Sequence, residues 1–254
     1  MARRFESKVA LVTGGTSGLG RDAAVAFARE GAKVVVTGRR IREGQETVEL
    51  AKAAGGEATF VQADMSNPGE IEALFSACVK TYGGLDCAFN NAGIDGIINT
   101  PIVDYKLEIW NQVMAVNLTA MFLCMKYEIA EMLKRGGGSI VNMGALASVK
   151  TSTVVGAAYI ATKHAIVGLT KTGAIEYAGQ GIRANVVCPG VMRTPLSEKL
   201  LSTEAGRARV LSLHPIGRIG EPEEVSNLVL WLCSQEAAFI TGAVIPVDGG
   251  LMLR

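Results

Sequence analysis

The sequence has few of the residues that bind metals or form disulfides. Its 254 residues include only two histidines and five cysteines. The cysteines are odd in number, scattered through apolar stretches, and none stands at zinc-ligand spacing from another. We therefore expect reduced core thiols in a cytoplasmic protein, and no metal site. The cysteines are Cys78, Cys87, Cys124, Cys188 and Cys233.

An excess of charge of either sign is also missing. The chain has 25 Lys and Arg against 24 Asp and Glu, a formal net charge of +1. This balance predicts no nucleic-acid partner and no binding to an anionic membrane. No signal-peptide pattern opens the chain and no apolar run approaches the length of a membrane span. We therefore expect no membrane association.

What the sequence does have is a regular alternation of short apolar, branched segments with longer helical patterns. Such alternation predicts an α/β fold with a parallel sheet and helices on both faces. No linker, repeat or low-complexity segment divides the chain, and its length suits one large domain. Seven strands are expected at 8–12, 33–37, 58–62, 87–89, 139–143, 183–188 and 243–247. Six helices are expected at about 21–30, 41–54, 67–82, 101–133, 157–177 and 223–232.

A glycine-rich turn joins the first expected strand to the first expected helix. Residues 13–20 read Thr-Gly-Gly-Thr-Ser-Gly-Leu-Gly. In this setting glycines let the backbone approach a pyrophosphate, and the helix N-terminus offers free N–H groups. The spacing differs from the common Gly-x-Gly-x-x-Gly, and a tight turn without a ligand is the alternative. With the second strand, the pattern favours a single-domain Rossmann-type fold, doubly wound around a seven-stranded parallel sheet.

A second motif lies in the expected helix 157–177. Tyr159 and Lys163 are four residues apart, so they share one face of that helix. A nearby positive charge favours the phenolate and lowers the pKa of a tyrosine, which makes it a usable general acid or base. This spacing is common by chance, and a surface lysine beside a half-buried tyrosine is the alternative. The motif gains meaning from the dinucleotide-binding half that precedes it.

Taken in order, these motifs resemble the short-chain dehydrogenase/reductase family over nearly the whole chain. The resemblance implies a cofactor-binding half at about 8–143, a catalytic and substrate-binding half at about 144–254, and a homotetramer formed through two long helices. The matching pieces are residues 13–20, Asp64, residues 90–93, Asn117, Tyr159 with Lys163, Pro189 and Gly190 with Thr194, and residues 248–250.

The resemblance also implies catalytic roles. Tyr159 would give a proton to a carbonyl oxygen in reduction and take it back in oxidation. Lys163 would hold the nicotinamide ribose and lower the pKa of Tyr159. Asn117 would bend its helix and hold a water in a relay to Lys163. The alternative for Asn117 is a helix-interior polar residue bonded to the backbone.

Cofactor contacts are implied for a larger set of residues. Asp64 would bond the adenine amino group with Met65 against the ring, or else only cap the next turn. Asn90, Ala92 and Gly93 would line the adenosine ribose and steady the sheet, and Thr194 would contact the carboxamide or a phosphate. The implied cofactor set is Gly14, Thr16, Ser17, Gly18, Leu19, Gly20, Arg39, Arg40, Asp64, Met65, Asn91, Ala92, Gly93, Tyr159, Lys163, Pro189, Gly190, Val191 and Thr194.

One position departs from the family pattern. Ala145 stands where the family carries a serine that bonds the substrate oxygen, fourteen residues before Tyr159. Losing such a donor costs about 10²- to 10³-fold in rate. Ser148 lies three residues further on, at a spacing unsuited to the usual geometry. The chain is then an engineered serine-to-alanine variant, a slower natural enzyme, or a protein that has kept only cofactor binding.

The end of the second expected strand favours NADP over NAD. An acidic residue there would bond the adenosine 2′-hydroxyl and select NAD, but the sequence has Arg39 and Arg40. Arg39 is placed to stack on adenine and pair with a 2′-phosphate, and Arg40 to assist. The alternative is that both arginines only solvate the strand end, with Glu43 or Glu46 as partners.

Three irregular segments, 94–100, 146–156 and 191–215, are expected to enclose the substrate. Their apolar residues predict a small, hydrophobic carbonyl or alcohol substrate, although core packing explains such residues equally well. We expect an NADP-dependent oxidoreductase that interconverts ketones and secondary alcohols. The alternatives are a 3-oxoacyl thioester reductase and a catalytically weak NADP-binding interaction protein. The expected pocket residues are Leu146, Val155, Val191, Met192, Leu196 and Leu200.

Overall fold

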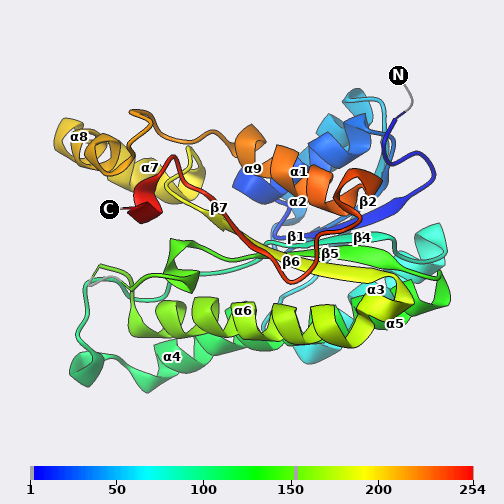
Figure 1. The fold of residues 1–254 in the computed structure, drawn as a ribbon, viewed down its shortest axis with the longest axis horizontal. Coiled ribbons are helices and arrows are strands. Elements are labelled where there is room, and N and C mark those ends of the chain that lie inside the picture. Colours follow the sequence, from blue (N-terminus) through cyan, green and yellow to red (C-terminus); the bar gives the residue numbers. More distant parts are fainter. Residues whose placement is uncertain (1–2, 152–153, 254) are drawn as a thin grey trace.

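A computed structural model describes residues 3–151 and 154–253 of the chain (Figure 1). Within these residues, seven strands form one parallel sheet in the order β3-β2-β1-β4-β5-β6-β7. The predicted fold class, a doubly wound Rossmann-type sheet, is therefore confirmed. The strands are β1 (Val9–Thr13), β2 (Lys33–Gly38), β3 (Glu57–Gln62), β4 (Cys87–Asn90), β5 (Gly138–Met143), β6 (Ile182–Pro189) and β7 (Val244–Val247).

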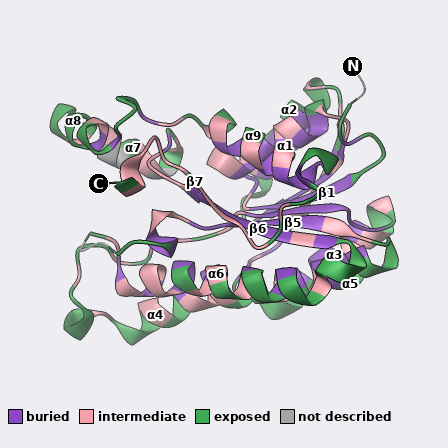
Figure 2. Ribbon diagram, in the orientation of Figure 1, coloured by how far each residue is buried: buried purple, intermediate pink, exposed green. Residues whose placement is uncertain are grey.

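Helices cover both faces of the sheet, as Figure 1 shows. Every residue of β1 is buried, because a parallel strand between two helical layers has no face left for water. Figure 2 shows the same division, with buried residues on the strands and on the inward helix faces. On one face lie α1 (Gly18–Arg29), α2 (Ile41–Ala53) and α9 (Pro222–Cys233), and on the other α3 (Pro68–Tyr82), α4 (Leu107–Met114), α5 (Ala120–Lys134) and α6 (Ala157–Tyr177).

The order of strands reverses between β1 and β4. From β1 the chain builds outward through β2 and β3, and then returns to pair β4 with the other edge of β1. Thr13 therefore has Thr37 on one side and Asn90 on the other. Such a switch point, at the carboxyl ends of the strands, is where open α/β sheets bind ligands.

The helix expected at 101–133 begins later and contains a π-turn. α4 and α5 form one continuous helix, Leu107–Lys134, through a π-turn at Ala115–Thr119. By length and composition alone this helix could cross a membrane, so the expectation that no run approaches a membrane span is wrong. Its apolar character has a physical reason in packing, because Val113, Met121 and Met125 are buried in the fold.

The segment expected to be rich in loops carries two more helices. They are α7 (Pro195–Leu201) and α8 (Glu204–Leu213). α7 begins at Thr194 as N-cap with a proline at its first position, and the Thr203 side chain caps α8 by accepting from Gly206 N–H. Both starts follow ordinary capping rules, so the sequence contained the signal for these helices.

Candidate active site

Close contacts with Asn91 and Ala92 fix the shape of the glycine turn. Gly14 has a φ of +64°, and a Cβ there would lie 2.9 Å from the Asn91 side chain and from the Ala92 backbone. The Asn91 amide donates to Thr13 O at 3.0 Å and Gly14 O at 3.2 Å. Asn91, predicted as a cofactor residue, thus holds the turn in place. The backbone of Ala92 also donates to the Thr13 hydroxyl at 3.1 Å.

The first turn of α1 fits an anionic group. Ser17 is the N-cap, but its side chain makes no capping hydrogen bond, and the first turn holds no acidic residue. The free N–H groups and the positive end of the helix dipole are therefore available to a phosphate. Gly18, with a φ of +54°, faces Thr194, to whose Cβ its own Cβ would be 3.5 Å away. The predicted residues Gly18 and Thr194 thus lie across from each other, at the starts of α1 and α7.

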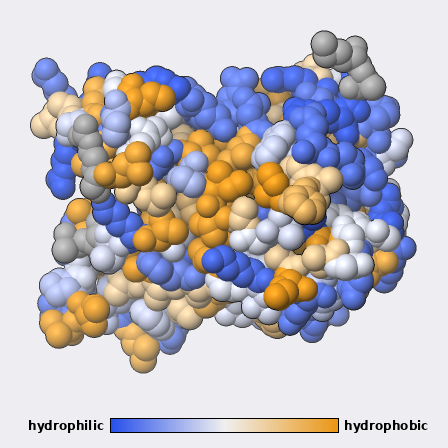
Figure 3. All heavy atoms as spheres, in the orientation of Figure 1, coloured by the Kyte–Doolittle hydropathy of each residue, from blue (hydrophilic) through white to orange (hydrophobic). Residues whose placement is uncertain are grey.

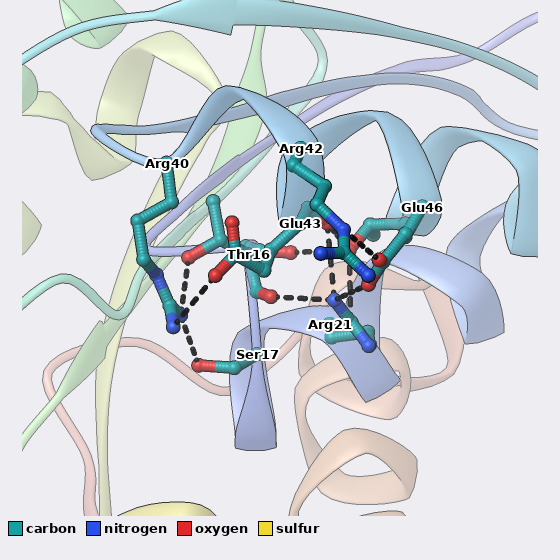
Figure 4. A network of polar contacts seen from close by, with 9 residues as sticks. Thr16, Ser17, Arg21, Arg40, Arg42, Glu43 and Glu46 are labelled. Carbon is teal, nitrogen blue, oxygen red and sulfur yellow. Dashed lines mark hydrogen bonds and ion pairs between the residues drawn. The ribbon is translucent and has the colours of Figure 1, made fainter.

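Of the two arginines after β2, Arg40 is the one held against the glycine turn (Figure 4). Its Nη2 donates to Thr16 Oγ1 at 2.9 Å and Ser17 Oγ at 2.7 Å. Arg39 extends outward, with two thirds of its side chain exposed and its Nη1 4.0 Å from Asp64 Oδ2. The sequence assigned the leading role to Arg39, whereas the geometry gives the anchored position to Arg40. Arg40 also pairs with Glu43 at 3.5 Å, the partner that the alternative expected.

Two of the predicted adenine residues have other partners. Asp64 Oδ1 accepts from Ser66 N at 2.9 Å and Ser66 Oγ at 2.8 Å, and these bonds lower the pKa of Asp64. It thus caps the next turn, as the alternative reading had it. Met65 is buried in the core beside Ile71. Asn90 is likewise buried, and its bonds to Asn142 of β5 and Glu128 of α5 agree with the expectation that it steadies the sheet, while its contact with the ribose stays a prediction.

Tyr159 and Lys163 share one face of α6, as predicted. The Lys163 Nζ lies 5.4 Å from the centre of the Tyr159 ring and donates to Met143 O, at the end of β5, at 2.7 Å. Burial lowers the pKa of Lys163 to about 8. Burial, and after it the charges of Asp95 and Cys188, raise the pKa of Tyr159. The expected effect of Lys163 on the pKa of Tyr159 stays a prediction, because burial is the largest cause of the shift and acts in the opposite direction.

Asn117 joins three elements through its buried amide. Its Oδ1 accepts from Ile94 N at 2.8 Å, and its Nδ2 donates to Ile94 O at 2.9 Å and Thr162 Oγ1 at 3.4 Å. The π-turn around it agrees with the expected bend in the helix, and π-turns occur often at functional sites. Asn117 thereby fixes the chain after Gly93 against α6, one residue from Lys163.

Ser148 is turned away from the role that Ala145 leaves open. Its Oγ accepts from Ala145 N–H at 3.1 Å, and its side chain is almost fully buried. It also hydrogen-bonds Cys188 at the end of β6; burial raises the pKa of that thiol, and this bond opposes the rise. The hydroxyl is thus engaged inside the fold.

The segment after β6 is tied down by a residue that the sequence analysis did not single out. His214 is buried, with Nδ1 2.8 Å from Val210 O, and its Nε2 accepts from Val191 N at 3.3 Å. It thus joins the end of α8 to the segment that follows the predicted cofactor residues Pro189 and Gly190. A lone histidine before a proline was the available signal.

The apolar residues expected to line the pocket divide into groups. Leu146, Val155 and Val191 are partly exposed in the structure. Met192 is largely buried against the core, but it lines a small cavity together with Val191 and His214, so its place in the substrate pocket stays a prediction. The side chains of Leu196 and Leu200 lie outside the described part of the chain, as do residues 152 and 153 of the expected loop 146–156.

Asp95 was also missed, although the fold places it in the site. It follows Ile94, which Asn117 holds, and its charge acts on both Tyr159 and Lys163. The available signal was that Asp95 is the one charged residue of the expected loop 94–100.

Comparisons with known proteins agree over the whole chain. A family model described as enoyl-(acyl carrier protein) reductase matches residues 14–252. The chain is 42% identical over 250 residues to cyclohexanol dehydrogenase of Acinetobacter sp. (strain SE19), covering 98% of this chain and 96% of that protein. It is 40% identical over 248 residues to 2,5-dichloro-2,5-cyclohexadiene-1,4-diol dehydrogenase of Sphingobium indicum, covering 97% of each.

A solved structure has the same fold. A putative 2-deoxy-D-gluconate 3-dehydrogenase from Agrobacterium tumefaciens, with bound NADP, superposes with a TM-score of 0.91 at 33% identity. The match covers 100% of this chain and 99% of that one.

Proposed function

The chain belongs to the short-chain dehydrogenase/reductase family, and from this membership we propose that it is an NADP-dependent oxidoreductase interconverting a secondary alcohol and a ketone. The observation that carries the proposal is the position of Tyr159 and Lys163. They share a face of α6, and Lys163 bonds the carboxyl end of β5 near the strand switch point. A proton-transferring phenol thus lies at the edge of the sheet that also carries the glycine turn.

Tyr159, Lys163 and Asn117 have different roles in the proposed reaction. When bound, the nicotinamide cofactor supplies the hydride in reduction and accepts it in oxidation. Tyr159 gives its phenolic proton to the carbonyl oxygen in reduction and takes it from the alcohol in oxidation. Lys163 would hold the ribose of the cofactor, and its positive charge, 5.4 Å from the centre of the Tyr159 ring, favours the phenolate. Asn117 positions Tyr159 and Lys163 through its hydrogen bonds with Ile94 and Thr162.

The choice of NADP rests on charge at the glycine turn. Arg40 is fixed by the hydroxyls of Thr16 and Ser17, next to the free N–H groups of α1. A guanidinium in this position suits a phosphate on the adenosine ribose. The solved relative with bound NADP agrees with this preference.

The substrate class follows from the relatives. One is named for cyclohexanol and another for a chlorinated cyclohexadiene-diol, both of which are six-membered rings with secondary hydroxyl groups. We extend this to a cyclic secondary alcohol and its ketone as the substrate pair here. The partly exposed Leu146, Val155 and Val191 suit such a ring.

A thioester carried by an acidic protein receives less support. A cavity of about 610 Å³ near α8 and α9 is lined by Arg193, Arg207 and Arg218, the basic patch that such docking would use. Glu221, Glu223 and Glu224 line the same cavity, and Arg218 pairs with Glu224 at 2.6 Å. The charges are balanced, so the cavity offers no net attraction to an acidic partner.

Initial rates of the chain and two variants test the proposed function. With cyclohexanol and NADP, we expect measurable oxidation, which Tyr159→Phe lowers by about 10²- to 10⁴-fold. Ala145→Ser is expected to raise the rate by about 10²- to 10³-fold, because it restores a donor to the developing charge. Cofactor binding by fluorescence titration serves as the control for folding. Tight NADPH binding with no turnover of any alcohol or ketone, even with serine at 145, would favour the non-catalytic alternative.

A further inference from the structure

Asp95 is held rigidly at the entrance to the site. On one side, Ile94 donates its N–H to Asn117 Oδ1 and accepts at its carbonyl from Asn117 Nδ2. On the other, Gly96 adopts a φ of +72°, and its Cβ position would lie 2.7 Å from the Tyr105 hydroxyl, so the backbone passes close to that side chain. Ile97 N also donates to the Tyr105 hydroxyl at 3.4 Å. Anchors on both sides leave the Asp95 backbone little freedom, which is how a binding residue is pre-organised.

The Asp95 carboxylate has no hydrogen bond or ion pair within residues 3–151 and 154–253, although it is partly buried. Burial raises its pKa, and the Lys163 ammonium opposes this rise. A partly desolvated carboxylate without a donor from the chain can accept a hydrogen bond from a ligand. The side chain thus has acceptor capacity that the chain itself does not use.

The charge of Asp95 also works against the proposed reaction. After burial, it is the largest cause that raises the pKa of Tyr159, and so it disfavours the phenolate that alcohol oxidation requires. The other titratable group that acts on both Tyr159 and Lys163 is Cys188. A donor placed on the carboxylate by the substrate would offset both its desolvation and its effect on Tyr159.

We propose that Asp95 binds a second hydroxyl group of the substrate, so that the enzyme acts on diols or hydroxyketones in preference to simple alcohols. The substrate hydroxyl donates to the carboxylate, while the carbinol that reacts lies at Tyr159. No bond beyond those of the oxidoreduction forms or breaks. This inference rests on the proposed function, and it makes Asp95 a specificity residue of the same site.

The test compares one alcohol with diols of the same ring. Oxidation by NADP is measured with cyclohexanol, cyclohexane-1,2-diol and cyclohexane-1,4-diol, for the wild type and for Asp95→Ala and Asp95→Asn. The wild type is expected to prefer at least one diol. Asp95→Ala is expected to lower kcat/KM for that diol about 10- to 100-fold, mainly through KM, because a hydrogen bond to a charged group is lost. Asp95→Asn keeps an uncharged acceptor and is expected to fall between.

Cyclohexanol and a second carboxylate provide the controls. With cyclohexanol, kcat/KM of the Asp95 variants is expected to stay within about threefold of the wild type or to rise, since Tyr159 loses an unfavourable neighbour. Asp104→Asn removes an exposed carboxylate from the nearby turn Ile102–Asp104. It is expected to leave kcat/KM unchanged for both cyclohexanol and the diols.

Several outcomes would overturn the proposal, and they are distinguishable. Equal loss with cyclohexanol and the diols in Asp95→Ala would assign Asp95 to the shared reaction or to the fold. If the wild type oxidises cyclohexanol and prefers none of the diols, Asp95 does not bind a second hydroxyl group of the substrate. If 2-aminocyclohexanol is oxidised in preference to every diol, the substrate group that Asp95 binds is an ammonium group and not a hydroxyl. A wild type that oxidises none of these would instead contradict the proposed function, and the inference with it.

Discussion

At the scale of single residues, two neighbouring arginines have different surroundings. Both follow β2, and both are candidates for a 2′-phosphate. Arg40 is fixed by Thr16 and Ser17, whereas Arg39 is largely exposed with Asp64 at 4.0 Å. A guanidinium that is already positioned loses less side-chain entropy on binding than one that is free. Arg40 should therefore contribute more to the affinity for NADP.

Replacing Arg40 tests this difference. Arg40→Ala is expected to raise the KM for NADP about 10- to 100-fold, because a charge-assisted contact to a phosphate is lost. The KM for NAD should change little, since NAD lacks that phosphate. Steady-state kinetics with both cofactors measures the ratio. Arg42→Ala is the matched control, because Arg42 is exposed and pairs with Glu46 at 3.2 Å (Figure 4). If Arg39→Ala raises the KM for NADP more than Arg40→Ala does, then Arg39 is the residue that binds the 2′-phosphate.

At the scale of elements, a buried polar network joins β4, β5, α5 and α6 behind the site. Asn90 Nδ2 donates to Glu128 Oε2 and to Asn142 Oδ1, both at 2.9 Å, and Asn142 Nδ2 donates to Thr170 Oγ1 at 2.8 Å. Two fully buried oxygens, Glu128 Oε1 and Asn90 Oδ1, have no partner among the described residues. A proton on Glu128 Oε1 would join these two oxygens and complete a two-bond pair with Asn90.

The pKa of Glu128 agrees with a neutral acid, and it sets the pH dependence of stability. Burial raises this pKa to about 8, from an ordinary value of 4.5. The folded chain thus binds a proton that the unfolded chain releases above its own pKa. The free energy of unfolding is therefore expected to fall between about pH 4.5 and pH 8 on account of Glu128, by on the order of a few kcal/mol.

Glu128→Gln is expected to remove that part of the pH dependence. The glutamine amide donates to Asn90 Oδ1 at every pH, and so reproduces the protonated acid. Denaturant unfolding at pH 5 and pH 8 should show the variant more stable than the wild type at pH 8, with a smaller difference at pH 5. Glu131→Gln, which removes a surface pair with Lys134, is the control on the same helix. A wild-type advantage at pH 8 would mean that Glu128 is ionised and paired.

Which elements the sequence predicted depends on how local their signals are. The alternation of apolar segments predicted every strand of the sheet, although only the central strands are buried throughout and the edge strands β3 and β7 are partly exposed. The capped starts of α7 and α8 were overlooked, because they lie in a segment dominated by turn residues. Spacing brought Tyr159 and Lys163 together correctly. The role of Glu128 was not predictable, because it comes from packing against Asn90, which lies 38 residues away in the chain.

At the scale of the whole molecule, apolar side chains remain on the outside. Ile175 on α6 is 82% exposed and Phe122 on α5 is 50% exposed. β7 is an edge strand whose residues are mostly half-buried. In Figure 3, hydrophobic residues, drawn as orange spheres, gather across the centre of the face that is shown. We propose that these exposed apolar groups belong to an interface between subunits. The homotetramer expected from the family would cover them.

Ile175→Glu tests that assembly. Burying an isoleucine side chain contributes about 1.5–3 kcal/mol, and a closed symmetric assembly repeats this contribution in every copy. A carboxylate at the same position would instead have to be desolvated. By light scattering after gel filtration, the wild type is expected at four times the chain mass of 26.7 kDa, and Ile175→Glu at a smaller multiple. Val103→Glu is the control, since Val103 is 91% exposed on the turn Ile102–Asp104, outside α5 and α6. A wild type that elutes at the mass of one chain would contradict the assembly, and an unchanged mass in Ile175→Glu would move the interface away from the outer face of α6.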